Sequence, residues 1–167
     1  KDKMLPNGMV WYPNVMYLSL MLMQEIKLGE ESHYKHFLGN FPEVDDFPLT
    51  YDNKTLELLV GSPLLKRIAK VRKNNREDYD MLVAAVPEIG EFTFEQYLQG
   101  VMWGSSRNFG VTINGTKTNV MVPLCDMFNH AEGFQADWTF DNVRQGFVMK
   151  ANKDIQKDEE IFDSYGV

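Results

Sequence analysis

The sequence is poor in cysteine, in histidine and in positive charge. Its 167 residues include one cysteine, Cys125, and three histidines, so the sequence predicts neither a disulfide framework nor a metal site. Seventeen basic residues stand against 24 acidic ones and give a net charge of −7, which argues against direct nucleic-acid binding. The lack of disulfides favours a reducing compartment, the cytoplasm or the nucleus.

Long hydrophobic runs are also absent. The densest one, Val15 to Met23, is too short to cross a bilayer and leads into polar residues, so no membrane association is expected. A hydrophobic fraction of 44% and a charged fraction of 25% are ordinary values for a globular protein. The length suffices for one domain with a proper core, or for a core with one sizeable insertion. The acidic balance is compatible with a basic protein segment as partner.

Helical patterns dominate the first hundred residues. Thr93-Phe94-Glu95-Gln96 has the form of a capping box and opens one of the helices. Prolines and acidic residues predict a surface loop over 42–51. The other predicted helices, taken from apolar spacing and from glycine and proline stops, span 14–29, 30–38, 55–61 and 63–83.

The predicted helix over 63–83 has a basic polar face. Either this face is simply solvated, or it docks a substrate, and the first interpretation is favoured because charge runs usually face water. The residues concerned are Lys66, Arg67, Lys70, Arg72 and Lys73.

Strand patterns replace the helical ones after Ser105. The Asn114-Gly115 pair predicts a tight hairpin between strands at 109–113 and 118–122, because this dipeptide is typical of two-residue turns. Further strands are predicted at 136–140, 146–151 and 160–165.

The segment between the first hairpin and the next strand carries several polar residues. A helical turn starting near Leu124 would gather Asp126, Asn129 and His130. Each also has a structural explanation: Asp126 can cap the turn, Asn129 can adopt a left-handed conformation, and His130 can bond a carbonyl.

The order of these motifs resembles the C-terminal half of the SET domain. The Asn-His pair at 129–130 is followed by the segment 154–166, which ends in Tyr165-Gly166. Upstream, Ser106-Arg107-Asn108-Phe109 resembles the Ser-Arg-x-Phe element of the subfamily of the plant Rubisco large-subunit lysine methyltransferase. Members of that subfamily split the SET core with a long helical insertion.

The resemblance implies an α+β fold, with a SET-type, β-clip-like core of short strands interrupted by a mainly helical insertion. Residues 1–13 would precede the insertion within the core, 14–103 would form the insertion, and 104–167 would form the C-terminal half of the core. Two family elements are missing, a glycine-rich first cofactor element and the stretch after the tyrosine. We therefore expect a piece of a longer enzyme that binds its cofactor poorly alone.

The resemblance also implies a chemistry, the transfer of a methyl group from S-adenosyl-L-methionine to a lysine of a non-histone protein. Tyr165 matches the catalytic tyrosine of the family. Asn129 and His130 match a pair that contacts the cofactor. Asp126 and Arg107 match further positions of the cofactor pocket, where Arg107 is the natural partner of the methionine carboxylate. Without these companions, Tyr165 would be an aromatic residue that closes a strand.

Phe109 is a candidate substrate-binding residue. In this subfamily a phenylalanine at that place accompanies lysine substrates, because an aromatic wall packs the aliphatic stem of lysine. Asp158 replaces a turn glycine of the family, which aspartate tolerates. The alternative functions are a catalytically inactive SET-like module for protein interaction and, less well supported, a helical adaptor.

Overall fold

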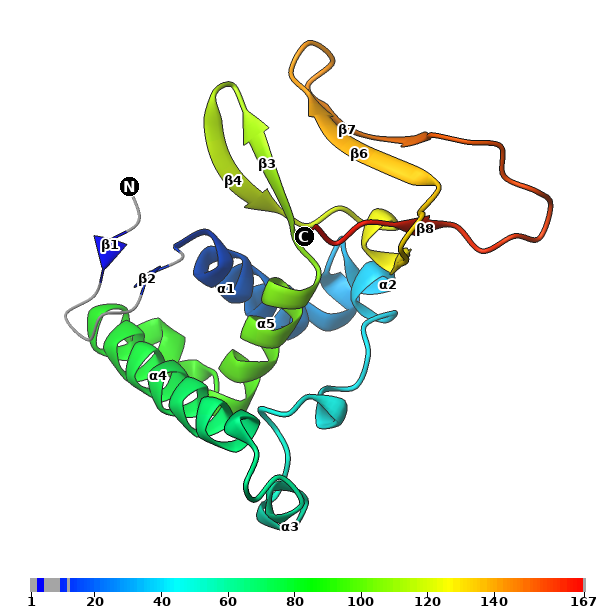
Figure 1. Ribbon diagram of the computed structural model, residues 1–167. Coiled ribbons are helices and arrows are strands. Elements are labelled where there is room, and N and C mark those ends of the chain that lie inside the picture. The colour runs from blue at the N-terminus through cyan, green and yellow to red at the C-terminus, as the bar shows by residue number, and fades with distance from the viewer. Residues whose placement is uncertain (1–2, 5–9, 12, 167) are drawn as a thin grey trace. The chain divides into compact units, whose positions relative to one another are not determined.

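The computed structural model describes residues 3–4, 10–11 and 13–166 (Figure 1). The chain divides into two compact units, Lys1–Ser106 and Arg107–Val167. The first is mainly helical and the second is built of short strands and loops. Of the predicted core segment 1–13, most residues lie outside the described ones, and the short strands β1 (Lys3–Met4) and β2 (Val10–Trp11) pair antiparallel. The interpretation of 14–103 as an insertion stays a prediction.

The helical unit contains five α-helices in its described part. Apolar spacing and stop signals predicted most of them, but several boundaries differ, and the helix predicted over 55–61 ends at Glu57. The helix predicted from Thr55 begins at Asn53, because the side chain of Asp52 accepts the N–H of Thr55 at 2.7 Å. The bounds are α1 Pro13–Leu28, α2 Lys35–Leu38, α3 Asn53–Glu57, α4 Pro63–Ala85 and α5 Phe94–Ser106, with 3-10 turns η1 Gly29–Glu31, η2 Val44–Asp46 and η3 Pro87–Glu91.

The single helix predicted over 30–38 is wrong, because η1 and α2 are separated at Ser32. This serine is buried, its hydroxyl accepts the N–H of Tyr34 at 3.0 Å, and it donates to Glu25 at 2.6 Å. A side chain that bonds a nearby backbone N–H competes with the helical pattern. By contrast the predicted capping box is confirmed, since Thr93 and Gln96 exchange side-chain bonds with each other's N–H groups.

The core of this unit lies between α1 and α5. Ser19 and Met23 of α1 are almost fully buried, and Gly100 of α5 faces them. A Cβ atom on Gly100 would lie 2.8 Å from the carbonyl oxygen of Ser19, so only glycine permits this approach. Among the described helices, none is long and apolar enough to cross a lipid bilayer.

The second unit contains two antiparallel hairpins. Strand β3 (Phe109–Ile113) pairs with β4 (Thr116–Val120), and β6 (Ala136–Asp141) pairs with β7 (Gly146–Ala151). Asn114 and Gly115 have φ of 49° and 81°, which confirms the predicted two-residue turn. The strand predicted over 118–122 starts earlier, at Thr116, because so short a turn leaves no other residue before the ladder resumes.

The last pair of strands is parallel and very short. Strand β5 (Asn129–His130) lies beside β8 (Phe162–Asp163), with Asn129 opposite Phe162 and His130 opposite Asp163. The predicted strand over 160–165 is therefore shortened to two residues. The backbone groups of Ser164 and Tyr165 bond to side chains and not to a neighbouring strand. The Ser164 carbonyl accepts the indole N–H of Trp138 at 3.2 Å, and the Tyr165 N–H donates to His130 at 3.2 Å.

Gly100 provides a test of the helical core. Gly100→Ala adds a methyl group against the Ser19 carbonyl, so we expect a loss of about 1–3 kcal/mol in the free energy of unfolding. Helix propensity alone would give a gain of about 1 kcal/mol. Gly110→Ala, where no atom lies within 4 Å of the added Cβ, is the control. Urea unfolding followed by circular dichroism measures both variants, and a Gly100→Ala protein as stable as the parent contradicts the close approach.

Candidate functional site

The polar residues of the second unit gather around the β5–β8 pair. Gln135, 5% exposed, fastens the closing segment to the residues after β5. Its backbone N–H donates to the Phe162 carbonyl at 3.1 Å, and its side-chain oxygen accepts the Phe162 N–H at 3.0 Å. Its side-chain amide donates to Glu159 at 2.8 Å. The backbone that precedes Tyr165 is thereby held along β5.

His130 and Tyr165 lie next to each other at the end of this pair. The backbone N–H of Tyr165 donates to Nδ1 of His130 at 3.2 Å, and the two ring centroids are 5.4 Å apart. Nδ1 of His130 thus serves as the hydrogen-bond acceptor for the closing segment. The hydroxyl of Tyr165 donates to the Phe128 carbonyl at 3.0 Å, although 67% of the residue is exposed.

The predicted helical turn that would gather Asp126 and Asn129 is wrong. Only the 3-10 turn η4 (Cys125–Met127) forms there, and Asn129 and His130 continue as strand β5. The reason is that β8, more than 30 residues later, supplies backbone partners for an extended conformation. The side chain of Asn129 is exposed and donates to Glu160 at 2.7 Å.

Arg107 and Asp126, the other two predicted cofactor-binding residues, form an ion pair. Nη1 of Arg107 lies 3.0 Å from Oδ2 of Asp126 and 3.2 Å from its carbonyl oxygen. The Asp126 side chain is 0% exposed and that of Arg107 is 18% exposed. Burial raises the pKa of Asp126, and the bond and charge of Arg107 offset part of this rise.

Asp163 is a second buried carboxyl group in the same unit. The residue is 1% exposed, and burial raises its pKa, while His130 opposes the rise. Burial raises the pKa of Cys125, and the charges of Asp126 and Asp163 raise this pKa further. Within the described residues, Oδ1 of Asp126 and Oδ1 of Asp163 are buried and have no hydrogen-bond partner. A buried oxygen without a hydrogen-bond partner lowers the stability of the fold, unless a ligand supplies the missing bond.

Phe109, the predicted substrate-binding residue, lies mainly inside the second unit. It is 8% exposed, and its ring centroid is 5.1 Å from that of Trp138 and 4.8 Å from that of Phe147. The two hairpins thus pack on one another through this ring. Its role in substrate binding stays a prediction, as do the roles of the other five site residues.

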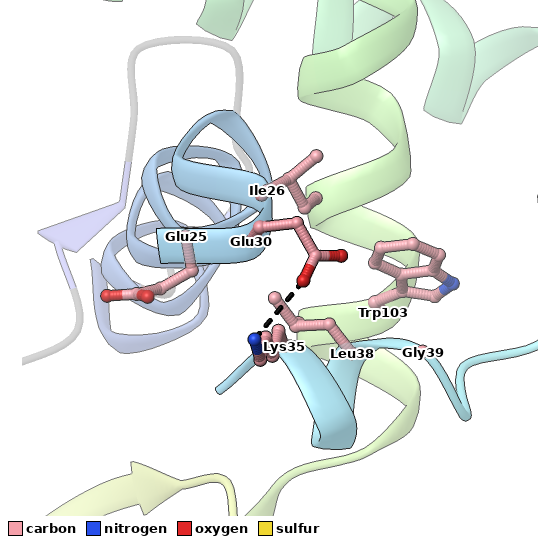
Figure 2. A pocket seen from close by; sticks show the side chains of 8 residues that line it. Glu25, Ile26, Glu30, Lys35, Leu38, Gly39 and Trp103 are labelled. Atoms are coloured by element: carbon pink, nitrogen blue, oxygen red, sulfur yellow. Dashed lines mark hydrogen bonds and ion pairs between the residues drawn. The ribbon is translucent and has the colours of Figure 1, made fainter. Parts of the chain in front are cut away.

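A metal site or a cavity elsewhere in the described part of the protein would be an alternative functional site. Among the described residues, no group of three His, Cys, Asp or Glu side chains is arranged to hold a metal ion. The helical unit contains a cavity of about 290 Å³ between α1, α2 and α5 (Figure 2). Trp103, Leu38 and the Glu30–Lys35 ion pair, 3.1 Å long, line it. None of the six predicted site residues takes part in it.

Sequence reasoning missed Gln135, Asp163 and Glu160. Gln135 stands before a strand with no motif around it, and its importance comes from bonds to Phe162 and Glu159. Asp163 follows two apolar residues, Ile161 and Phe162. Because successive side chains of a strand point to opposite faces, the sequence does not show whether Asp163 points inward or outward. Only the pairing of Phe162 with Asn129 decides the face.

Comparison with known proteins gives a consistent result. The family model "SET domain" matches residues 20–166. The ribulose-1,5-bisphosphate carboxylase/oxygenase large subunit N-methyltransferase of Pisum sativum is 23% identical in an alignment of 159 residues that covers 87% of this chain and 32% of that protein. The chain thus spans about a third of the length of this relative.

Solved structures agree on the fold. The SET domain of LSMT bound to methyllysine and AdoHcy has a TM-score of 0.73 at 20% identity, covering 92% of this chain and 36% of that one. Rubisco LSMT bound to AdoMet has a TM-score of 0.71 at 21% identity, covering 92% and 36% of the two chains. The predicted α+β fold of SET type is confirmed.

The buried carboxyl of Asp163 predicts a pH effect on stability. Because burial raises its pKa above the ordinary 3.8, the folded state holds this proton more tightly than the unfolded state. The wild type should therefore lose stability, relative to Asp163→Asn, as pH rises from 3.8 through the raised pKa. A proton held ten-fold more tightly in the folded state corresponds to about 1.4 kcal/mol in the free energy of unfolding.

Unfolding free energies of wild type and Asp163→Asn between pH 4 and pH 8 measure this difference. Asp137→Asn, at an exposed position of β6, controls for the loss of one negative charge. A stability difference between wild type and Asp163→Asn that stays constant over this range would show that burial does not raise the pKa of Asp163.

Proposed function

Because the chain belongs to the SET-domain family, we propose that it is the catalytic part of an S-adenosylmethionine-dependent protein-lysine N-methyltransferase acting on a non-histone protein. The observation that carries the proposal is the gathering of Asn129, His130 and Tyr165 at one short strand pair. The relative from Pisum sativum, whose name states methylation of a carboxylase subunit, supports a non-histone protein substrate that presents a lysine.

The buried carboxylate of Asp126 supports a cationic cofactor. S-adenosylmethionine carries positive charge on its sulfonium and on its α-amino group, and it supplies the methyl group that is transferred. Oδ1 of Asp126 is buried without a partner, which fits a positively charged ligand. Arg107, held by Oδ2 of the same carboxylate, offers the positive charge that a methionine carboxylate needs. Asn129 and His130 complete the proposed cofactor-binding set.

Tyr165 is the proposed catalytic residue. Its hydroxyl donates to the Phe128 carbonyl, so the lone pairs of the phenolic oxygen remain to accept a bond from a neutral amine. A free lysine has a pKa near 10.4, and only its uncharged form is a nucleophile. Holding the amine in line with the methyl group accounts for the rate, because orientation replaces a bimolecular encounter.

Phe109 supports lysine over histidine as the acceptor. Its ring is fixed by Trp138 and Phe147, so any exposed edge is a rigid apolar wall. Such a wall contacts the methylene stem of lysine and offers no hydrogen bond to an imidazole nitrogen. We assign Phe109 to the binding of the substrate side chain on this ground.

Tyr165→Phe tests the function directly. Removal of the hydroxyl should lower methyl transfer by the intact protein on the order of 10²-fold, as when one positioned polar group leaves an active site. Transfer is measured with radiolabelled S-adenosylmethionine, and cofactor binding, measured by calorimetry, should change little. Tyr17→Phe, at a 62% exposed tyrosine of α1, is the matched control and should keep full activity. Equal activity of the Tyr165→Phe and wild-type proteins would refute a catalytic role and favour a binding module.

A further inference from the structure

The helical unit exposes apolar and basic side chains together where α3 meets α4. This surface, the α3–α4 corner, comprises Leu58, Val60, Leu64, Lys66, Arg67 and Lys70. Leu58 is 84% exposed, Val60 74% and Leu64 41%, and the three cations are exposed as well. Exposed apolar side chains that gather in one place, in contrast to single ones, mark interaction sites.

The apolar part of the corner is held by backbone hydrogen bonds. The N–H groups of Leu58, Leu59 and Val60 donate to carbonyls three residues earlier, at 3.0 to 3.2 Å. Ser62 then accepts the N–H of Leu64 at 3.2 Å and begins α4. The turn therefore presents Leu58 and Val60 in a fixed place, at low entropic cost for a partner. Figure 1 shows α3 at the end of α4 where this turn lies.

The basic part of the corner follows from the geometry of α4. Lys66 and Lys70 are one turn apart, and Arg67 is their neighbour, while the buried Ile68 faces the opposite, inner side. Between Leu58 and Lys73 no acidic residue occurs, although the chain carries a net charge of −7. The corner thus carries three cations and no acidic residue, and the exposed Glu57 precedes it.

Arg72 and Lys73, the next two cations of α4, already bond to other groups of the protein and are not part of the corner. Arg72 donates to the carbonyls of Leu49 and Tyr51 and so ties the loop before α3 to α4. Lys73 lies 3.7 Å from Glu77, an exposed pair along the same helix. Lys66, Arg67 and Lys70 have no ion pair with the described residues. Their charge is available to a partner.

We propose that the α3–α4 corner docks an acidic segment of another protein that carries apolar side chains. Carboxylates of the partner would meet Lys66, Arg67 and Lys70, and its apolar residues would cover Leu58 and Val60. Nucleic acid fits less well, because phosphates gain nothing from two exposed aliphatic side chains. An anionic membrane fits less well too, because the chain as a whole is acidic. The proposal needs no methyl transfer and stands independently of the proposed function.

Fluorescence anisotropy of the intact protein with a labelled peptide tests this docking. The probe has about twelve residues, with glutamates flanking two leucines. We expect micromolar binding that weakens at least ten-fold in Lys66→Glu/Lys70→Glu and in Leu58→Ser/Val60→Ser. Higher salt should weaken it as well, because exposed charges are screened. Circular dichroism confirms that both variants fold, as expected for substitutions at exposed positions.

A control variant and a control peptide distinguish binding at the corner from a general effect of net charge. Lys117→Glu/Lys157→Glu changes the net charge equally at exposed positions of the second unit and should leave the binding constant unchanged. A peptide with serines in place of the leucines should bind at least ten-fold more weakly. The proposal is overturned by no binding of the acidic peptide, by equal effects of the two charge-reversal variants, or by equal binding of the serine peptide. Tighter binding of an oligonucleotide or of phosphatidylserine vesicles at the corner overturns it too.

Discussion

The parallel pairing of Asn129–His130 with Phe162–Asp163 is the constraint on which the candidate site depends. Two residues on each strand supply little energy alone, so the pairing relies on Gln135, whose side chain and backbone both bond Phe162. Tyr165 then reaches His130 and Phe128 only because the preceding backbone is held along β5.

Buried carboxyl groups beside this pairing give the site its electrostatic character. Asp126 forms an ion pair with Arg107, whereas Asp163 forms no ion pair within the described residues. Each keeps one oxygen without a partner among the described residues. A fold optimised for stability alone would avoid such groups, since their desolvation costs free energy. A positively charged ligand, such as the proposed cofactor, would offset this cost at Asp126.

Local rules predicted much of the fold. The Asn114-Gly115 turn and the capping box of Thr93 and Gln96 are decided within four residues, and both are confirmed. The resemblance to the SET family correctly predicted the fold, but the conformation of Asn129 was mispredicted because its strand partner is Phe162. The burial of Asp163 follows from the same distant pairing, which no local pattern reveals. Site roles, by contrast, rest on chemistry that the fold alone does not test.

The most direct test of methyl transfer to lysine is to map the product. The intact protein would be incubated with S-adenosylmethionine carrying an isotopically labelled methyl group and with proteins from its own cell extract. The labelled residues would then be identified by mass spectrometry. We expect the label on the side-chain nitrogen of a lysine in a non-histone protein. Label found only on histidine ring nitrogens, or no transfer at all, would contradict a lysine methyltransferase built around Tyr165.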